Sequence, residues 1–346
     1  MNISKQWPQI TVFLFLLLST LHGTGQEEQS SSYSGREGKI TVYISGPEEM
    51  VNQLETSFEA ERGDVLELIN MGGGALRQRV WTESESGGIQ ADLFWGTDPL
   101  IYMALDEKGA LEEYRSPEYD NLKEIYQLEG NYTIVNERYG VVIYNKDEMK
   151  DNPPRSFADL TSPVYKDKLV HADPAQSSTA LALIAGLWDL TGTDGEFHKG
   201  LIENGLFLSK KNSDVPSKIQ EGEFTAGIAP HDTVIRLQKK AKKDGYPTPL
   251  AIAWPEEGAV AIQRPVAISK NPARPEANQI LAREFVDFLL SQEAQAIGSR
   301  FAFVSAREDM PPTAGVPEDL TIRRVDWTVL SENQYNTSDA FKALFR

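Results

Sequence analysis

The chain has 346 residues, a length that suits two medium-sized domains better than one small core. Hydrophobic residues make up 40% and charged residues 25%, ordinary values for a globular protein. The net charge of −17 argues against nucleic acid or an anionic membrane face as a partner, although a pocket can differ in sign from the whole surface.

The first residues resemble an export signal. Lys5 supplies a positive charge, and the apolar run 10–21 is too short for a comfortable membrane span. Small residues at 23–25 suit cleavage, so we predict a signal peptide over 1–25, with retention as an anchor as the alternative. Residues 26–38 are polar and rich in Ser, which predicts a flexible leader. The absence of cysteine excludes disulfides and thiolate chemistry, and suits a periplasmic protein with a large core.

Strands and helices are predicted to alternate in the first part of the mature chain. Alternating β-branched residues predict strands at 39–46, 65–69 and 91–95. Helices are predicted at 47–60, where Pro occupies the first turn, and from 75 to 82. This alternation favours an open parallel α/β sheet.

Two long extended segments, 132–144 and 258–269, flank a central block. Within that block we expect strands at 168–172 and 224–228 and helices at 156–160, 180–190 and 234–243. After it, an amphipathic helix is predicted over 278–291, with Ile280, Phe285, Phe288 and Leu289 on its apolar face. The chain would leave its first lobe near Asn136 and return near Arg264. The predicted domains are lobe 1 from 39–136, lobe 2 from 137–264, and the rest of lobe 1 with a C-terminal tail from 265–346.

Catalytic signatures are missing from this sequence. It contains no Walker loop, no HExxH motif and no GxSxG elbow. Four histidines and no cysteine give little material for a metal or nucleophilic centre. We therefore expect no enzymatic activity and no cofactor, with a secreted hydrolase as the weakest alternative.

Several small polar residues follow predicted strands or open predicted helices. In an open parallel sheet, ligands bind beyond the carboxyl ends of the strands, where helix N-termini favour anions. Such residues are also common caps and turn formers, but they recur here at equivalent places in both predicted lobes. The expected anion-binding residues are Ser45, Gly73, Thr97, Ser177, Ser178 and Thr179.

Acidic and imidazole side chains could bind the rest of a ligand. His231 and Asp232 follow a predicted strand, and Glu256 and Glu257 precede the second extended segment. The plainer interpretations are that Asp232 caps the following helix and that the Glu pair forms a solvated turn. As ligand residues, His231, Asp232 and Glu256 would accept hydrogen bonds from sugar hydroxyls or an ammonium group.

These residues together resemble a known family, the ABC-importer solute-binding proteins of the ferric-iron, phosphonate and sugar-phosphate type. The resemblance covers nearly the whole mature chain and rests on Ser45, Gly72–Gly74, Ala91–Gly96, Tyr144–Lys146, Ser156–Leu160, Tyr165–Lys168, Asp173-Pro174, Ser177–Thr179 and Glu284–Gln295. It implies the two-lobed periplasmic-binding-protein fold of type 2, an α/β fold hinged by two crossing strands. It also implies a monomer that delivers a small solute to an ABC permease in the inner membrane.

The resemblance also bears on the ligand. Ferric-iron members are expected to carry adjacent tyrosines where this chain has His231 and Asp232, which puts iron ligation by phenolate in doubt. A His-Asp pair followed by Glu256 is more similar to the hexose-phosphate-binding branch. The leading hypothesis is therefore capture of a sugar phosphate or a phosphonate. The alternative is capture of ferric or another metal ion, with His231, Asp232 and Glu256 as ligands.

Overall fold

The computed structural model describes residues 35–191, 195–327, 341 and 343–344. The predicted signal peptide and most of the predicted leader lie outside these residues. The elements of the fold belong to one unit, residues 31–346. Among the described residues, we find no helix with the length and apolar character needed to cross a membrane.

One mixed sheet of eleven strands organises the described part of the chain, and eight of its strands follow the order β2-β1-β3-β9-β4-β7-β5-β6. The strands are β1 (Ile40–Ile44), β2 (Leu66–Asn70), β3 (Leu93–Trp95), β4 (Thr133–Asn145), β5 (Leu169–Ala172), β6 (Phe207–Ser209), β7 (Ala226–Pro230), β8 (Leu250–Ala253), β9 (Ala259–Ile268), β10 (Val304–Ser305) and β11 (Ile322–Arg323). Parallel pairing holds within β1–β3 and within β5–β7. The prediction of a parallel sheet, made from the first part of the mature chain, is therefore correct for β1–β3. In the centre, β4 and β9 pair antiparallel with each other and with β7 and β3 respectively.

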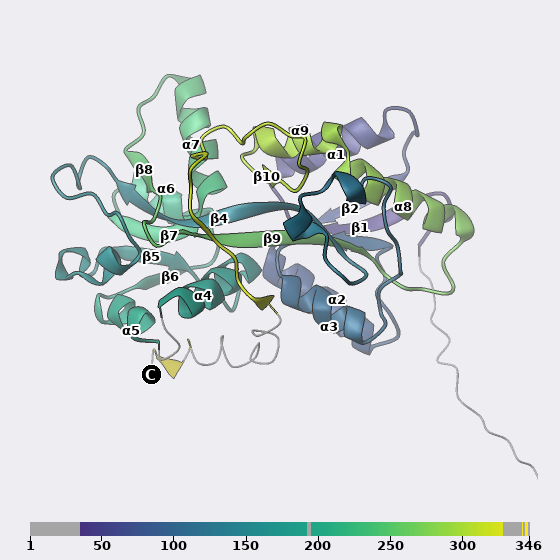
Figure 1. Ribbon diagram of the computed structural model, residues 1–346, viewed down its shortest axis with the longest axis horizontal. Helices are drawn as coiled ribbons and strands as arrows, with labels where there is room; N and C mark the ends of the chain where they lie inside the picture. The colour runs from purple at the N-terminus through teal and green to yellow at the C-terminus, as the bar shows by residue number, and fades with distance from the viewer. Residues whose placement is uncertain (1–34, 192–194, 328–340, 342, 345–346) are drawn as a thin grey trace, which may run out of the picture. The chain divides into compact units, whose positions relative to one another are not determined.

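The two long central strands are the segments that the sequence predicted to cross between lobes. β4 and β9 run side by side across the middle of the sheet in Figure 1. Asn136 and Arg264, the predicted crossing points, are register partners in this pair. We call β1–β3 with their helices the first half of the sheet, and β5–β8 with theirs the second half. The exact lobe boundaries stay a prediction.

Helices cover both faces of the sheet. They are α1 (Glu48–Glu59), α2 (Gly73–Glu85), α3 (Pro99–Glu107), α4 (Ser178–Thr191), α5 (Glu196–Glu203), α6 (Asp214–Gln220), α7 (His231–Asp244), α8 (Glu276–Leu290) and α9 (Gln292–Arg300). In Figure 1, α1, α7, α8 and α9 lie above the sheet, and α2, α3, α4 and α5 lie below it. The helix predicted over 156–160 is a 3₁₀ turn at Ala158–Thr161.

The core divides in the same way as the sheet. Two clusters of buried apolar side chains sandwich the first half, and two others sandwich the second. On α8, Phe285 and Leu289 are buried as predicted, but Ile280 is 52% exposed. Phe285 lies five positions after Ile280. At about 100° per residue, the two side chains point roughly 140° apart around the helix, so Ile280 faces away from the buried side. Its place on the apolar face was therefore predicted wrongly.

Candidate functional site

A cavity of about 390 Å³ lies where strands of both halves end and helices begin. We call it the inner pocket. Its wall combines the β1–α1 and β2–α2 turns of the first half with the β5–α4 and β6–α6 turns of the second. It is lined by Ser45, Gly46, Pro47, Asn70, Met71, Gly72, Gly73, Arg138, Gln176, Ser177, Thr179, Lys210, Lys211, Asn212, Ser213, Thr233, Arg236 and Phe303.

Three of the predicted small residues, Ser45, Gly73 and Ser178, lie close together at the wall of this pocket. A Cβ placed on Gly73 would lie 3.6 Å from Ser178 Oγ and 3.7 Å from Ser45 Oγ, so residues from β1, α2 and α4 converge there. Ser178 is buried, and its hydroxyl has no hydrogen-bond partner among the residues that the structure describes. A buried hydroxyl without a partner is costly, which makes this oxygen available to a ligand.

The two halves touch at the same place. A Cβ on Gly74 would lie 2.4 Å from the carbonyl oxygen of Gln176, so the backbone at the start of α2 meets the backbone before α4. Only glycine allows this approach. The first turns of both helices carry N–H groups without intrahelical partners, which favour an anion between them.

A buried charge cluster forms the opposite wall of the pocket. Arg138 of β4 donates two hydrogen bonds to Asp232, with Nε–Oδ1 at 2.7 Å and Nη2–Oδ2 at 2.8 Å. Arg236 lies one helical turn beyond Asp232 on α7 and pairs with the same carboxylate. Asp232 is fully buried, whereas both guanidinium groups line the pocket. Two cations therefore share one anion and leave an excess positive charge facing the cavity.

Neighbouring side chains add to this positive charge. Burial raises the pKa of Asp232, but the guanidinium groups of Arg138 and Arg236 outweigh that effect and hold its pKa below the usual range. Lys210 and Lys211 follow β6 on the pocket rim, and within the described residues neither pairs with a carboxylate. The pocket is thus cationic in a chain whose net charge is −17.

A third arginine, Arg264, lies beside the pocket. Arg264 of β9 is 1% exposed, donates to the carbonyl oxygen of Ser45 and to Asn136 Oδ1, and stacks between the rings of Trp95 and Phe303 at 4.4 and 4.6 Å. No carboxylate in the described part of the chain pairs with this guanidinium. Burial, and after it the charge of Arg138, lower its pKa to about 9. An anion in the adjacent pocket would stabilise its charged form.

His231 has a structural environment. Its Nδ1 accepts from the Tyr139 N–H at 2.9 Å, and its Nε2 lies 2.8 Å from the Ala302 carbonyl oxygen. Burial lowers its pKa to about 4, so the ring is neutral and donates from Nε2. His231 and Asp232 do not line the inner pocket, although Asp232 acts on it through its two arginines. The interpretation of Asp232 as a helix cap is wrong, because α7 begins at His231 and no side chain caps it.

The remaining predicted residues lie at different distances from the pocket. Ser45, Gly73, Ser177 and Thr179 line it, whereas Thr97 is buried between β3 and α3 and does not. Glu256 is exposed, does not line it, and donates its backbone N–H to the Arg155 carbonyl oxygen. Among the described residues no three His, Asp or Glu side chains are grouped as metal ligands, so His231, Asp232 and Glu256 do not converge. The role of each in binding stays a prediction.

Sequence reasoning missed the cations of this site. Arg138 lies within the predicted extended segment 132–144 and was not singled out as a site residue. Because β6 was not predicted, Lys210 and Lys211 were not placed at a strand end. Two signals were available: a charged residue in the middle of an apolar strand, and an Asp–Arg pair four residues apart at the start of a helix. Each of them indicates a buried or partly buried ion pair.

A mixed sheet in two halves, joined by crossing strands and enclosing a cationic pocket between strand ends, defines a type 2 periplasmic binding protein. Proteins of this class close around a solute by hinge motion. The chain belongs to the bacterial extracellular solute-binding protein family, whose model matches residues 90–333. The predicted family and fold class are thereby confirmed, and the chain is a solute-binding protein of the ABC-importer type.

Relatives with this fold bind different solutes. A Salmonella typhimurium protein is 25% identical over 298 residues, which cover 82% of this chain and 83% of its own; its provisional name is 2-aminoethylphosphonate-binding periplasmic protein. The periplasmic binding protein AfuA of Actinobacillus pleuropneumoniae, solved with fructose-6-phosphate bound, is 25% identical with a TM-score of 0.74, covering 90% of this chain and 97% of its own. Iron-bound HitA of Pseudomonas aeruginosa, 16% identical with a TM-score of 0.74, covers 88% and 99% and shares the fold.

Proposed function

We propose that this protein captures a small phosphorylated organic solute, a sugar phosphate or a phosphonate, in the inner pocket and delivers it to an ABC permease. The observation that carries the proposal is the excess of positive charge around a pocket built from helix starts and hydroxyls. Arg138, Arg236, Lys210 and Lys211 suit a phosphate, as do the N–H groups at the starts of α2 and α4.

The relatives support the same ligand class. The Salmonella protein is named for a phosphonate, and AfuA holds a phosphorylated sugar. Both ligands carry a tetrahedral anion on a small organic group, which is the chemistry that the inner pocket suits. We further propose export through the signal peptide at 1–25, a periplasmic location, action as a monomer, and no catalysis.

Calorimetry tests this proposal with four probes: fructose 6-phosphate, fructose, inorganic phosphate and ferric iron. We expect the ester to bind best, since the sugar lacks the anion and free phosphate makes only part of the contacts. If ferric iron binds tightly while the phosphate ester does not bind, the ligand assignment is wrong.

A hydroxyl variant with a matched control makes the test specific to the pocket. Ser178→Ala removes a buried hydroxyl that lies beside Gly73 of the pocket wall. We expect about tenfold or greater loss of affinity for the ester, because hydrogen bonds to charged groups are strong. Ser217→Ala removes a hydroxyl outside the inner pocket that already donates to the Ser213 carbonyl oxygen. Equal losses in both variants would contradict a phosphate at Ser178.

A further inference from the structure

One face of α7 carries polar and cationic side chains from the inner pocket outward. Thr233, Arg236, Lys240 and Lys243 recur at intervals of three or four residues and therefore share that face. Thr233 and Arg236 line the inner pocket, whereas Lys240 and Lys243 lie beyond it. From Arg236 to Lys243 the helix advances about 10 Å, at 1.5 Å per residue.

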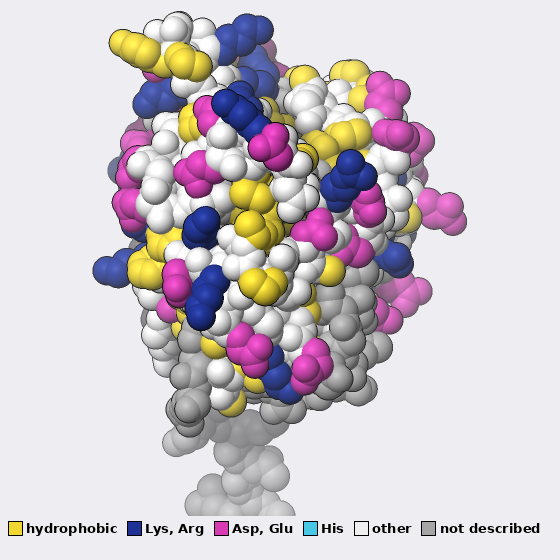
Figure 2. All heavy atoms as spheres, turned by 90° about the vertical axis from the view of Figure 1, so that its left-hand side faces the viewer, with side chains coloured by type: hydrophobic (Ala, Val, Ile, Leu, Met, Phe, Trp, Pro, Cys, Tyr) yellow, Lys and Arg dark blue, Asp and Glu magenta, His cyan; other side chains and the backbone are white. Residues whose placement is uncertain are grey.

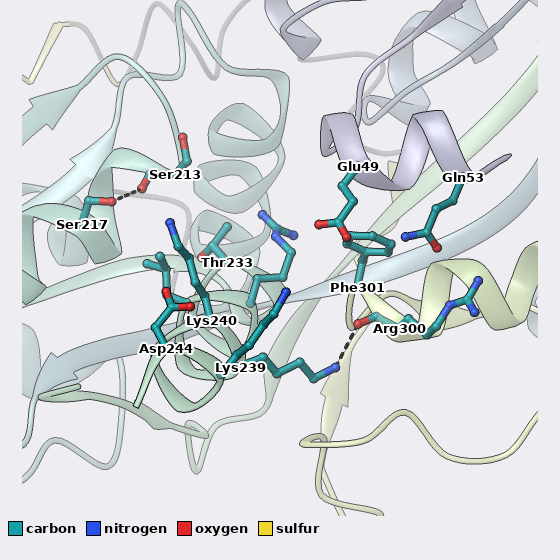
Figure 3. Close-up of a pocket in the computed structure, with 13 residues that line it drawn as sticks. Glu49, Gln53, Ser213, Ser217, Thr233, Lys239, Lys240, Asp244, Arg300 and Phe301 are labelled. Atoms are coloured by element: carbon teal, nitrogen blue, oxygen red, sulfur yellow. Dashed lines mark hydrogen bonds between the residues drawn. The ribbon is translucent and has the colours of Figure 1, made fainter. Parts of the chain in front are cut away.

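The outer part of this face borders a second cavity, of about 700 Å³, which we call the outer groove. It lies between α7 and α6 of the second half and α1 and the end of α9 of the first half, as Figure 3 shows. Ser213, Thr233 and Arg236 line both cavities, so the groove continues the inner pocket. Lys239 closes one side by donating to the Arg300 carbonyl oxygen at 2.9 Å.

Positive charge exceeds negative charge along the groove. Apart from Arg236, which pairs with Asp232, its charged lining residues are Lys239, Lys240, Lys243, Arg300, Glu49 and Asp244. Within the described residues, no carboxylate forms an ion pair with Lys240, Lys243 or Arg300. Figure 2 shows basic side chains gathered at the top of its face, at the level of α7. An acidic protein thus presents a cationic channel, which attracts anions and directs them inward.

The distances along α7 relate the two anion positions. An anion at Arg236 occupies the inner pocket, while a second anion at Lys240 or Lys243 would lie about 6–10 Å farther along the helix axis. A neutral oxygen could accept a hydrogen bond from these ammonium groups but would lack the attraction between opposite charges, and an apolar tail would offer neither. A ligand with an anionic group at each end suits both cavities.

We propose that the outer groove is a second anion subsite and that the solute carries two anionic groups, a phosphate or phosphonate in the inner pocket and a phosphate or carboxylate against Lys240 and Lys243. This inference rests on the proposed function, because it adds a subsite to the same cleft. It narrows the ligand class from phosphorylated solutes to those with two separated anions.

Calorimetry with three phosphorylated probes tests the subsite. Fructose 6-phosphate carries one anion, a hexose bisphosphate carries phosphates on both terminal carbons, and gluconate phosphorylated on its terminal carbon combines a phosphate with a carboxylate. We expect one of the two doubly anionic probes to bind about tenfold more tightly than fructose 6-phosphate, since each exposed charge pair contributes a few-fold. The probe that binds more tightly than fructose 6-phosphate shows whether the second anion is a phosphate or a carboxylate.

Variants on α7 test whether the tighter binding of a doubly anionic probe comes from the outer groove. Lys240→Gln with Lys243→Gln should remove the tenfold advantage and change the affinity for fructose 6-phosphate less than twofold. Lys242→Gln is the matched control, because Lys242 is exposed on the same helix but does not line the groove. It should leave the advantage unchanged, and an equal effect of both variants would overturn the inference.

Two failures are distinguishable. If fructose 6-phosphate binds and neither doubly anionic probe binds more tightly, the subsite is overturned and the proposed function stands. If no phosphorylated probe binds, both the subsite and the sugar-phosphate form of the proposed function are wrong.

Discussion

The inner pocket and the outer groove are continuous, but they hold their charges in different ways. At the wall of the inner pocket, the largely buried Arg138 donates two hydrogen bonds to Asp232, which is fully buried behind it. In the outer groove, Lys240 and Lys243 are exposed and unpaired within the described residues. Buried charges depend on their partners, whereas exposed charges depend on the solvent. The inner pocket should therefore respond to mutation and pH, and the outer groove to salt.

The largest effect should come from removing the shared carboxylate. Asp232→Asn leaves Arg138 buried beside Arg236 with no anion, and losing one partner of a buried pair costs about 3–5 kcal/mol. Urea unfolding should show this loss of stability. Asp244→Asn, at the exposed end of the same helix, should change the free energy of unfolding by less than about 0.5 kcal/mol. Similar values for the two variants would remove the contrast between the regions.

Lowering the pH should reduce the stability of the fold beside the inner pocket, through protonation of His231. Burial lowers its pKa to about 4, below the ordinary value of 6.5, so the folded protein binds the proton less readily than the unfolded chain. The neutral His231 therefore contributes to the free energy of unfolding above pH 6.5. This contribution is lost as the pH falls toward 4, and the loss reaches about 2 kcal/mol near pH 4.5.

A variant isolates this contribution from that of His171, whose pKa burial also lowers to about 4. We expect the difference in unfolding free energy between pH 7 and pH 4.5 to be smaller in His231→Gln by about 2 kcal/mol. Thermal unfolding at the two pH values measures it. An unchanged difference would show that His231 does not remain neutral in the fold.

Salt should have the smallest effect and act mainly on the outer groove. Raising the ionic strength from about 0.01 M to about 0.15 M shortens the Debye length from about 30 Å to about 8 Å. The affinity advantage of a doubly anionic probe over fructose 6-phosphate should fall by a few-fold, because Lys240 and Lys243 are exposed. Calorimetry at both salt concentrations tests this. An advantage independent of salt would place the second anion in a buried site.

The fold could be predicted well from the sequence, because its strongest signals are local. The crossing segments were identifiable as long apolar runs, and they became β4 and β9 with Asn136 and Arg264 as partners. The direction of these strands was not predictable, since antiparallel pairing depends on contacts between residues more than a hundred positions apart. β6 was missed because three residues are too short to show a period.

The site was predicted only in part, for a similar reason. Ser45, Gly73, Ser177 and Thr179 were identifiable because turns at strand ends have a local signature. The pairing of Arg138 with Asp232 joins residues 94 positions apart, and no local pattern specifies it. The prediction of Asp232 as a ligand residue stays a prediction, and in the structure its carboxylate pairs with Arg138 and Arg236.

The close approach of Gly74 to Gln176 relates the spacing of the two halves to the size of the solute. A Cβ on Gly74 would lie 2.4 Å from the Gln176 carbonyl oxygen, so the two backbones leave no room for a side chain between them. A solute that overfills the cavity of about 390 Å³ would break the contact, and one that leaves room would not. We therefore expect a larger solute to hold the two halves farther apart at Gly74 than a smaller one.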